Sequence, residues 1–272
     1  MSVTLTNLDR VLWPETGFTK GDLVAYYERV APALLPHLAR RALTLWRFPE
    51  GVHRRGWWQN ECRGAPDWMT VAEIRGQRFC VVDDEPSLVW VANQGTVELH
   101  PFGSTVDAPE TPLRLLVDLD PGAPAGLVEC CRVALAARRS LGEATLVKTS
   151  GASGLHLAAP AAATFADTKA VARELAERLA WELPELVVAE QRREARRGRV
   201  LVDWLQSDAT RTTAAPYSLR ATRVPSVSTP VTWDEVEAAA AARDATTLRF
   251  GPQDVRARLD RDGDLWSDLA LP

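Results

Sequence analysis

Two aspartates interrupt an apolar run in the segment RLLVDLDPG, residues 114–122. In a β-strand, residues i and i+2 point to the same face, so the Cα atoms of Asp118 and Asp120 would lie about 6.5 Å apart. Two ionised carboxylates at this spacing repel each other unless one takes up a proton or a cation binds between them. The pair therefore predicts a metal site, and the alternative is an ordinary turn formed by the D-P-G triplet at 120–122.

A third acid, Asp203, interrupts the apolar segment VLVDWLQ, residues 200–206. Three carboxylates at strand ends are the oxygen ligands that hard cations such as Mg²⁺ and Mn²⁺ require. Metals in a two-ion site lie about 3.5–4 Å apart, a distance that such a group of acids can bridge. The alternative for Asp203 is a salt bridge to one of the arginines that precede it.

The segment KTSGASGLHLAAP, residues 148–160, combines small residues with a histidine. Gly151 permits a tight turn after Ser150, and the chain then enters a strand that carries His156. Such a loop exposes backbone N–H groups and hydroxyls, which suit phosphate oxygens. It is not a Walker loop, since no lysine follows a G-x-x-x-x-G pattern, and the alternative is an ordinary glycine hairpin.

Adjacent tryptophans stand in the segment RRGWWQN, with two arginines before them. Exposed aromatic rings in a loop, flanked by positive charge, suit base stacking together with attraction to a nucleic-acid backbone. The alternative for Trp57 and Trp58 is a corner of the hydrophobic core.

Helical and strand patterns alternate along the chain, which favours one compact α/β unit over residues 1–272. Thr19 is a typical N-cap for the first helix. We expect helices over 17–38, 86–95, 126–142, 168–184 and 232–244, the last of which would close the fold. We expect strands over 41–48, 77–84, 96–101, 113–120, 144–150, 155–160 and 200–206. The segment 61–69 and most of the chain after residue 207 read as loops.

Composition limits the classes of function. The net charge of -4 argues against a generic nucleic-acid binder, although basic residues outnumber acidic ones in 1–63 and 190–223. The four cysteines form no C-x-x-C pair, which predicts reduced thiols in a cytosolic protein and no structural zinc. The N-terminus lacks the apolar segment of a signal peptide, and no apolar run of about 18 residues predicts a membrane span.

Seven segments occur in the order and spacing of one known family: NLDRVLWPETGFTKGDLVAYY, LTLWRFPEGV, VELHP, VDLDPG, KTSGASGLHLAAP, GRVLVDWLQ and TAAPYSLRA. Across nearly its whole length the chain resembles the polymerase domain of bacterial ligase D, in the archaeo-eukaryotic primase superfamily. The resemblance implies an α/β (α+β) fold, with a primase-like core of mixed β-sheets flanked by helices. No ligase or nuclease segment accompanies it, so we expect a stand-alone member.

The resemblance implies roles for individual residues. The metal ions would be held by Asp118, Asp120 and Asp203. The incoming nucleoside triphosphate would be bound by Ser150, His156, Gln206 and Arg220, with His100 nearby. A 5′-phosphate on the DNA downstream of a gap would be bound by Asn7, Arg10 and Lys20, whose amide and basic groups suit a phosphate. Trp57 and Trp58 stand where the family has two phenylalanines that stack on the template.

The function implied is template-directed nucleotidyl transfer by a DNA/RNA primase-polymerase that fills gaps at DNA ends in non-homologous end joining. The cofactors would be two Mn²⁺ or Mg²⁺ ions, and ribonucleotides would be the preferred substrates. Expected partners are double-stranded DNA ends or gapped DNA with a 5′-phosphate, nucleoside triphosphates, Ku and a DNA ligase. The expected location is the cytoplasm, in association with the nucleoid and without a membrane.

Three positions depart from the family pattern. Ser153 and Asn60 stand where lysines are common, and Arg223 follows R-A-T where R-A-R is usual. None of these changes touches the three acids, so we expect activity, with weaker or altered nucleotide selection. Two other functions remain as alternatives: a catalytically weak module that binds and bridges DNA ends, and a metal-dependent phosphoesterase that needs no nucleoside triphosphate.

Overall fold

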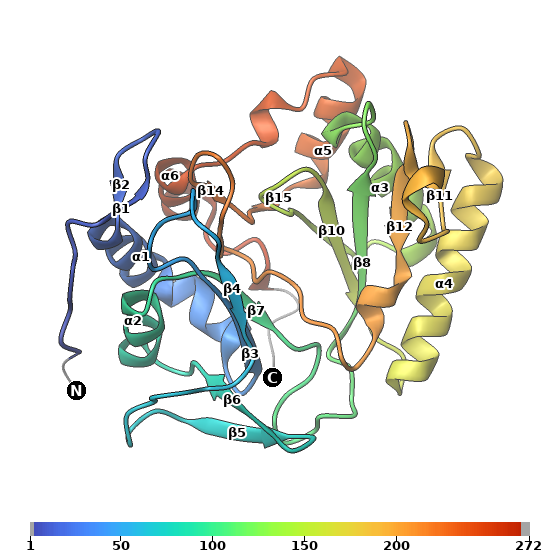
Figure 1. The fold of residues 1–272 in the computed structure, drawn as a ribbon. Coiled ribbons are helices and arrows are strands. Elements are labelled where there is room, and N and C mark those ends of the chain that lie inside the picture. The colour runs from blue at the N-terminus through green and yellow to red at the C-terminus, as the bar shows by residue number, and fades with distance from the viewer. Residues whose placement is uncertain (1–2, 268–272) are drawn as a thin grey trace. The chain divides into compact units, whose positions relative to one another are not determined.

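A computed structural model describes residues 3–267 of the chain (Figure 1). The chain forms two compact units that alternate along the sequence. Among the described residues, unit 1 comprises the segments 3–109, 212–228 and 250–267, and unit 2 comprises 110–211 and 229–249. We describe each unit by itself, and the expectation of one domain over 1–272 stays a prediction.

Unit 1 contains an antiparallel sheet in which β3 (Ala42–Arg47) is the central strand. One edge of β3 pairs with β4 and β6, its other edge pairs with β7, and β6 continues to β5. These partners are β4 (Trp57–Gln59), β5 (Val71–Ile74), β6 (Gln77–Val81) and β7 (Thr96–Pro101). Two short strand pairs complete the unit's β-structure: β1 (Val11–Trp13) with β2 (Phe18–Thr19), and β13 (Leu219–Arg220) with β14 (Ser226–Val227).

The helices of unit 1 are α1 (Lys20–Leu38), α2 (Glu85–Asn93) and α6 (Pro252–Asp262). Thr19 caps α1 as predicted, because its hydroxyl accepts from the Asp22 backbone N–H while the Asp22 carboxylate accepts from that of Thr19. One face of α1 carries apolar residues such as Leu23, Tyr27 and Leu34, which are fully buried in the core. The prediction that the helix over 232–244 closes the fold is wrong, because α6 follows it.

Unit 2 contains a six-stranded mixed sheet in the order β11-β12-β8-β10-β9-β15. Its strands are β8 (Arg114–Pro121), β9 (Leu146–Thr149), β10 (Leu155–Pro160), β11 (Val187–Val188), β12 (Val200–Asp203) and β15 (Pro230–Val231). Only β11 and β12 run parallel within this sheet. Figure 1 shows β8 between β10 and β12, and the helices α3 (Leu127–Leu141) and α4 (Phe165–Glu182) pack against this sheet. The unit also contains α5 (Trp233–Ala242).

The predicted fold class is confirmed, since helices flank a mixed sheet and the long elements lie where the sequence places them. The strand expected over 200–206 is shorter than predicted: β12 ends at Asp203, and Trp204–Ser207 form a 3₁₀ helix. The loop expected for the tryptophan pair is also wrong, because both residues lie in β4. Within residues 3–267, no helix combines the length and apolar character that crossing a membrane would take.

The prediction of reduced cysteines is wrong for one pair. Cys62, in the loop after β4, forms a disulfide with Cys80 of β6, and their Cα atoms lie 4.9 Å apart. The Cys62 backbone N–H donates to the Arg78 carbonyl at 2.7 Å, so the loop lies alongside β6. The pairing results from the return of the chain through β5 and β6, which cysteine spacing alone does not reveal. Cys130 and Cys131 are free and buried, and burial raises the pKa of Cys131 to about 11.

Candidate active site

The three predicted acids lie on one face of the unit 2 sheet. Asp118 and Asp120 are two residues apart within β8, so the alternative of a turn at 120–122 is wrong. Asp203 of β12 is paired directly with Asp118, and directly opposite residues point to the same face. The apolar residues that alternate with the acids, Val117 and Leu119, are fully buried on the other face.

Asp203 is held by neutral donors. Its Oδ1 accepts from Gln191 Nε2 at 3.1 Å and from the Leu205 backbone N–H at 3.0 Å. Within the described part of the chain, Asp203 forms no salt bridge to a preceding arginine, so that alternative is not seen. Arg192 pairs with Glu190, and Arg196 donates to the Gln191 carbonyl. In residues 3–267, no three His, Cys, Asp or Glu side chains are close enough together to hold a metal ion as they stand. The donors still fit a hard cation in type, because all three are carboxylates that are only partly buried.

His156 and Lys148 continue this row of side chains across the sheet. His156 of β10 is paired with Asp118 on one side and with Lys148 of β9 on the other. Lys148 Nζ lies 2.7 Å from His156 Nδ1, and His156 Nε2 lies 3.4 Å from Asp118 Oδ1. Because an ammonium group only donates, Nδ1 accepts, which places the ring proton of a neutral His156 on Nε2, facing Asp118. His156 was predicted from the sequence and Lys148 was not, although Lys148 begins the same motif.

The predicted phosphate loop is a hairpin between β9 and β10, so the glycine-hairpin interpretation is correct for its backbone. Gly151 has a φ of +75°, in the left-handed region that favours glycine. The Ser150 hydroxyl accepts from the Ala152 and Gly154 backbone N–H groups at 3.2 and 3.1 Å, which orders the loop. A Cβ atom on Gly154 would lie 2.0 Å from the Leu119 carbonyl oxygen, so the hairpin passes directly beside the strand of the acids. Gln206 lies in the 3₁₀ helix that follows Asp203.

His100 and Arg220 lie in unit 1, so the predicted nucleotide-binding residues are distributed over both units. His100 and Arg220 meet at Glu98, a buried residue of β7 that the sequence analysis missed. His100 Nε2 lies 2.7 Å from Glu98 Oε2, and Arg220 Nε lies 2.9 Å from the same oxygen. Burial raises the pKa of Glu98, but the hydrogen bond to His100 and the Arg220 charge outweigh it and hold the pKa below its ordinary value.

The tryptophan pair is exposed, so the alternative of a core corner is wrong: Trp57 is 46% exposed and Trp58 48% exposed. Trp58 stacks on Trp46 with ring centroids 4.9 Å apart and an angle of 12° between the planes. Its ring also meets His100 edge to face at 4.8 Å. The Arg47 guanidinium lies over the Trp57 ring, 5.2 Å from its centroid. These contacts hold two partly exposed aromatic rings on β4 in fixed orientations.

Asn7, Arg10 and Lys20 line one pocket of about 180 Å³ in unit 1, as the resemblance implies for a 5′-phosphate site. Arg47 lines it as well, and the sequence analysis missed this residue. The lining holds three cationic side chains and no carboxylate. Lys20 is 5% exposed, and burial, together with the charge of Arg10, lowers its pKa. A small concave site of this charge is suited to an anion.

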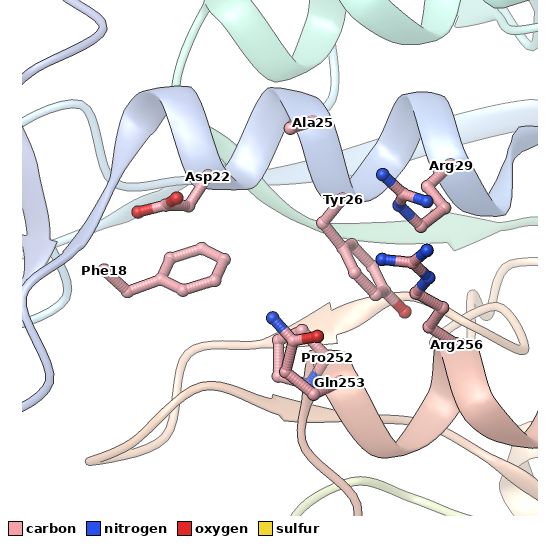
Figure 2. Close-up of a pocket in the computed structure, with 8 residues that line it drawn as sticks. All are labelled: Phe18, Asp22, Ala25, Tyr26, Arg29, Pro252, Gln253 and Arg256. Carbon is pink, nitrogen blue, oxygen red and sulfur yellow. The ribbon is translucent and has the colours of Figure 1, made fainter.

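Another pocket, of about 160 Å³, lies between α1 and α6 (Figure 2). Figure 2 shows Arg29 of α1 and Arg256 of α6 with their guanidinium groups beside Tyr26. None of the predicted site residues lines this pocket. Its one carboxylate, Asp22, accepts the Thr19 backbone N–H at 2.8 Å in the cap of α1. The pocket therefore lacks the set of groups that the candidate active site needs.

Comparisons with known proteins identify the family. The family model described as "LigD, primase-polymerase domain" matches residues 19–266. The chain belongs to this family. It is 36% identical to the multifunctional non-homologous end joining protein LigD of Mycolicibacterium smegmatis, covering 98% of this chain and 36% of that protein. For the Mycobacterium tuberculosis LigD protein the identity is 37%, covering 98% of this chain and 37% of the relative.

The structure of this chain is similar to a solved structure described as the polymerase domain from Mycobacterium tuberculosis ligase D in complex with DNA. The TM-score is 0.90 at 34% identity, over 100% of this chain and 99% of that one. The ligase D resemblance noted in the sequence is thus confirmed. The chain spans little more than a third of the length of the curated LigD relatives it matches.

The three departures from the LigD pattern lie on the surface. Ser153 and Asn60 are exposed, and neither supplies the positive charge that a lysine would bring. Arg223 forms an ion pair with Glu15, with Arg223 Nε 2.6 Å from Glu15 Oε1. Arg223 is therefore already paired within unit 1. To bind a triphosphate as a second arginine, it would first have to release Glu15.

Proposed function

We propose that this member of the LigD primase-polymerase family is a metal-dependent, template-directed nucleotidyltransferase that extends DNA 3′-ends at gaps during non-homologous end joining. The observation that carries the proposal is the placement of Asp118, Asp120 and Asp203 on one face of adjacent, directly paired strands. Carboxylates gathered on one face of a sheet are the oxygen donors that Mg²⁺ or Mn²⁺ ions require.

In this proposal the three acids would hold two ions, and the bound ions would supply activation of the primer 3′-hydroxyl and neutralisation of charge on the triphosphate. Ser150 and His156 hold phosphate oxygens beside them, since the hairpin passes next to β8. Nucleotide-binding roles are also proposed for Gln206 of unit 2 and for His100 and Arg220 of unit 1. The protein contributes mainly positioning and charge neutralisation, as in other phosphoryl transfers.

DNA recognition in the proposal uses groups of unit 1. The cationic pocket of Asn7, Arg10 and Lys20 binds the downstream 5′-phosphate, and Trp57 and Trp58 stack on the template. Ribonucleotides are the preferred substrates and Mn²⁺ the better activator. The proposed partners are Ku and a DNA ligase, and the proposed location is the cytoplasm, in association with the nucleoid. The names of the LigD relatives support an end-joining role.

The central test is primer extension on a gapped duplex that carries a 5′-phosphate, with Mn²⁺ and each rNTP or dNTP in turn. We expect templated incorporation, and we expect Asp118→Asn and Asp203→Asn to abolish it while DNA affinity is kept. The matched control is Glu174→Gln, an exposed carboxylate of α4 that should leave the rate unchanged. Full incorporation by Asp203→Asn would refute the metal site, and DNA cleavage without nucleoside triphosphate would favour a phosphoesterase.

A second test separates the end-binding groups from the catalytic ones. Lys20→Ala should weaken binding to a gap with a 5′-phosphate but not to the same gap with a 5′-hydroxyl. If Lys20 neutralises one phosphate charge, the slope of log affinity against log salt should become shallower by about 1. Equal losses on both DNAs would show that Lys20 does not read the phosphate.

A further inference from the structure

Glu98 is a carboxylate at the centre of unit 1 that is only 1% exposed. It binds groups from two separate parts of the chain. On its own strand β7 it contacts His100, and from the segment 219–221 it contacts Arg220 and the Ala221 backbone N–H. The distances are 2.7 Å to His100 Nε2, 2.9 Å to Arg220 Nε and 2.9 Å to Ala221 N.

The position of Glu98 in the strand accounts for this convergence. Glu98 and His100 are two residues apart in β7, so their side chains share a face. The 219–221 segment is anchored beside β7, because the Leu99 N–H donates to the Ser218 hydroxyl at 2.9 Å. A buried carboxylate is costly unless its oxygens are satisfied. Here Oε2 accepts from His100 Nε2 and Oε1 accepts from the Ala221 backbone N–H, while Arg220 supplies the opposite charge.

The cluster around Glu98 also contacts Trp58, one of the two tryptophans proposed to stack on the template. The His100 ring that binds Glu98 is also met edge to face by Trp58, which itself stacks on Trp46. Side chains of unit 1 therefore form one continuous series of contacts that runs from the exposed tryptophan to the arginine: Trp58, His100, Glu98 and Arg220.

We propose that Glu98 is a positioning residue that holds His100 and Arg220 in the orientation in which they bind the triphosphate. This inference rests on the nucleotide-binding roles in the proposed function. Glu98 does not contact the substrate. It fixes the His100 ring by the hydrogen bond at Nε2 and holds the Arg220 guanidinium nearby by an ion pair at Nε.

The test is the steady-state kinetics of Glu98→Gln in primer extension. The amide keeps the size of the side chain but turns a donor toward His100 or Arg220, so at least one of them is released. We expect KM for the nucleoside triphosphate to rise by about tenfold or more, with a smaller change in kcat. Affinity for gapped DNA should change much less than KM, because the 5′-phosphate pocket shares no residue with this cluster and Trp58 keeps its stacking partner Trp46.

The matched control is Thr96→Val, a nearly isosteric change at a fully buried polar residue of the same strand. It should leave KM unchanged. A triple variant, Glu98→Gln with His100→Ala and Arg220→Ala, should be no worse in KM than the variant that carries only His100→Ala and Arg220→Ala, because Glu98 acts through these two residues. If Glu98→Gln does not fold, Glu98→Asp carries the same test, since it keeps the charge but is too short to hold both partners.

A wild-type KM in folded Glu98→Gln, or a triple variant with a clearly higher KM than the variant that carries only His100→Ala and Arg220→Ala, would overturn the positioning role. Failure of the wild-type protein to incorporate any nucleotide would instead refute the proposed function. The two failures are therefore told apart by the wild-type measurement.

Discussion

At the scale of single residues, the acids could be predicted from the sequence because each one breaks an apolar strand pattern. Asp118, Asp120 and Asp203 are conspicuous for this reason, and the strand register brings them to one face. Glu98 and Lys148 could not be found in this way. A single charged residue in a buried strand shows its role only through the side chains that contact it in the fold. For Glu98 and Lys148, these side chains come from other strands or from distant segments.

Lys148 offers a test of the unit 2 side of the site. Lys148→Met keeps the length of the side chain but removes the donor to His156 Nδ1, so the ring proton is no longer directed to Nε2. We expect incorporation to fall by about tenfold or more, in line with the loss of one charged hydrogen bond. Single-turnover extension at saturating nucleotide measures this.

Lys169→Met is the matched control, since that lysine pairs with Asp208 rather than with the predicted site. If Lys148→Met and Lys169→Met behave alike, the orientation of His156 does not depend on Lys148.

At the scale of elements, the long helices and strands follow from apolar periodicity and caps. The short strands β1, β2, β11, β13, β14 and β15 have only two or three residues each, too few for any periodic signal. Helix α6 buries only Val255 and Arg258, so its apolar stripe is too thin to stand out in the sequence.

The hairpin between β9 and β10 depends on the small residue at its second glycine. Gly154→Ala would place a methyl group 2.0 Å from the Leu119 carbonyl oxygen, and neither backbone can yield without breaking the β8–β10 ladder. We expect a loss of about 1–3 kcal/mol or more in the free energy of unfolding, measured by urea denaturation. Gly126→Ala is the control, because its nearest contact would be an ordinary 3.9 Å. Equal stability of the two variants would contradict the close approach.

The disulfide gives a second prediction about elements. Replacing Cys62 and Cys80 with serine removes a link across 18 residues, which by loop entropy lowers the free energy of unfolding by about 3 kcal/mol at most. Urea denaturation of the double variant and the wild-type protein measures the difference, which should vanish when reductant is present.

Thiol titration in denaturant checks the bond itself. We expect two reactive thiols per chain without reductant, from Cys130 and Cys131, and four with it. Four thiols without reductant would show that the pair is not joined.

At the scale of the whole molecule, the sequence predicted the fold class and the family but not how the chain is divided between its units. Local sequence patterns do not reveal which segments belong to the same unit, because the elements of unit 1 that follow residue 211 contact residues that lie far earlier in the chain. Asp264 is an example. It binds His37 of α1 at 2.8 Å and the Tyr217 hydroxyl at 2.6 Å, joining three segments of unit 1.

Asp264 should make the stability of the protein depend on pH. Burial raises its pKa, but hydrogen bonds and charge from His37 outweigh this and leave the pKa below its ordinary value. A lowered carboxyl pKa stabilises the folded state above the unfolded pKa of about 3.9, and this contribution is lost as pH falls through the folded pKa.

Asp264→Asn should therefore be destabilised relative to the wild-type protein near neutral pH, by a difference that shrinks as pH falls below about 4. Urea denaturation from pH 3 to pH 7 measures the difference. Asp260→Asn, at an exposed position of α6, is the control. A difference that is the same at every pH would contradict this role of the carboxylate.

The alternation of segments between the two units affects how the protein is made. On the ribosome, unit 1 begins to emerge first, yet its last helix lies beyond the whole of unit 2 in the sequence. Unit 2 in turn waits for its edge strand β15, which follows a return of the chain to unit 1. Neither unit can be completed before nearly all of the residues that form the two units have been translated, so the nascent chain exposes unfinished apolar surfaces until then, when chaperones would be needed most.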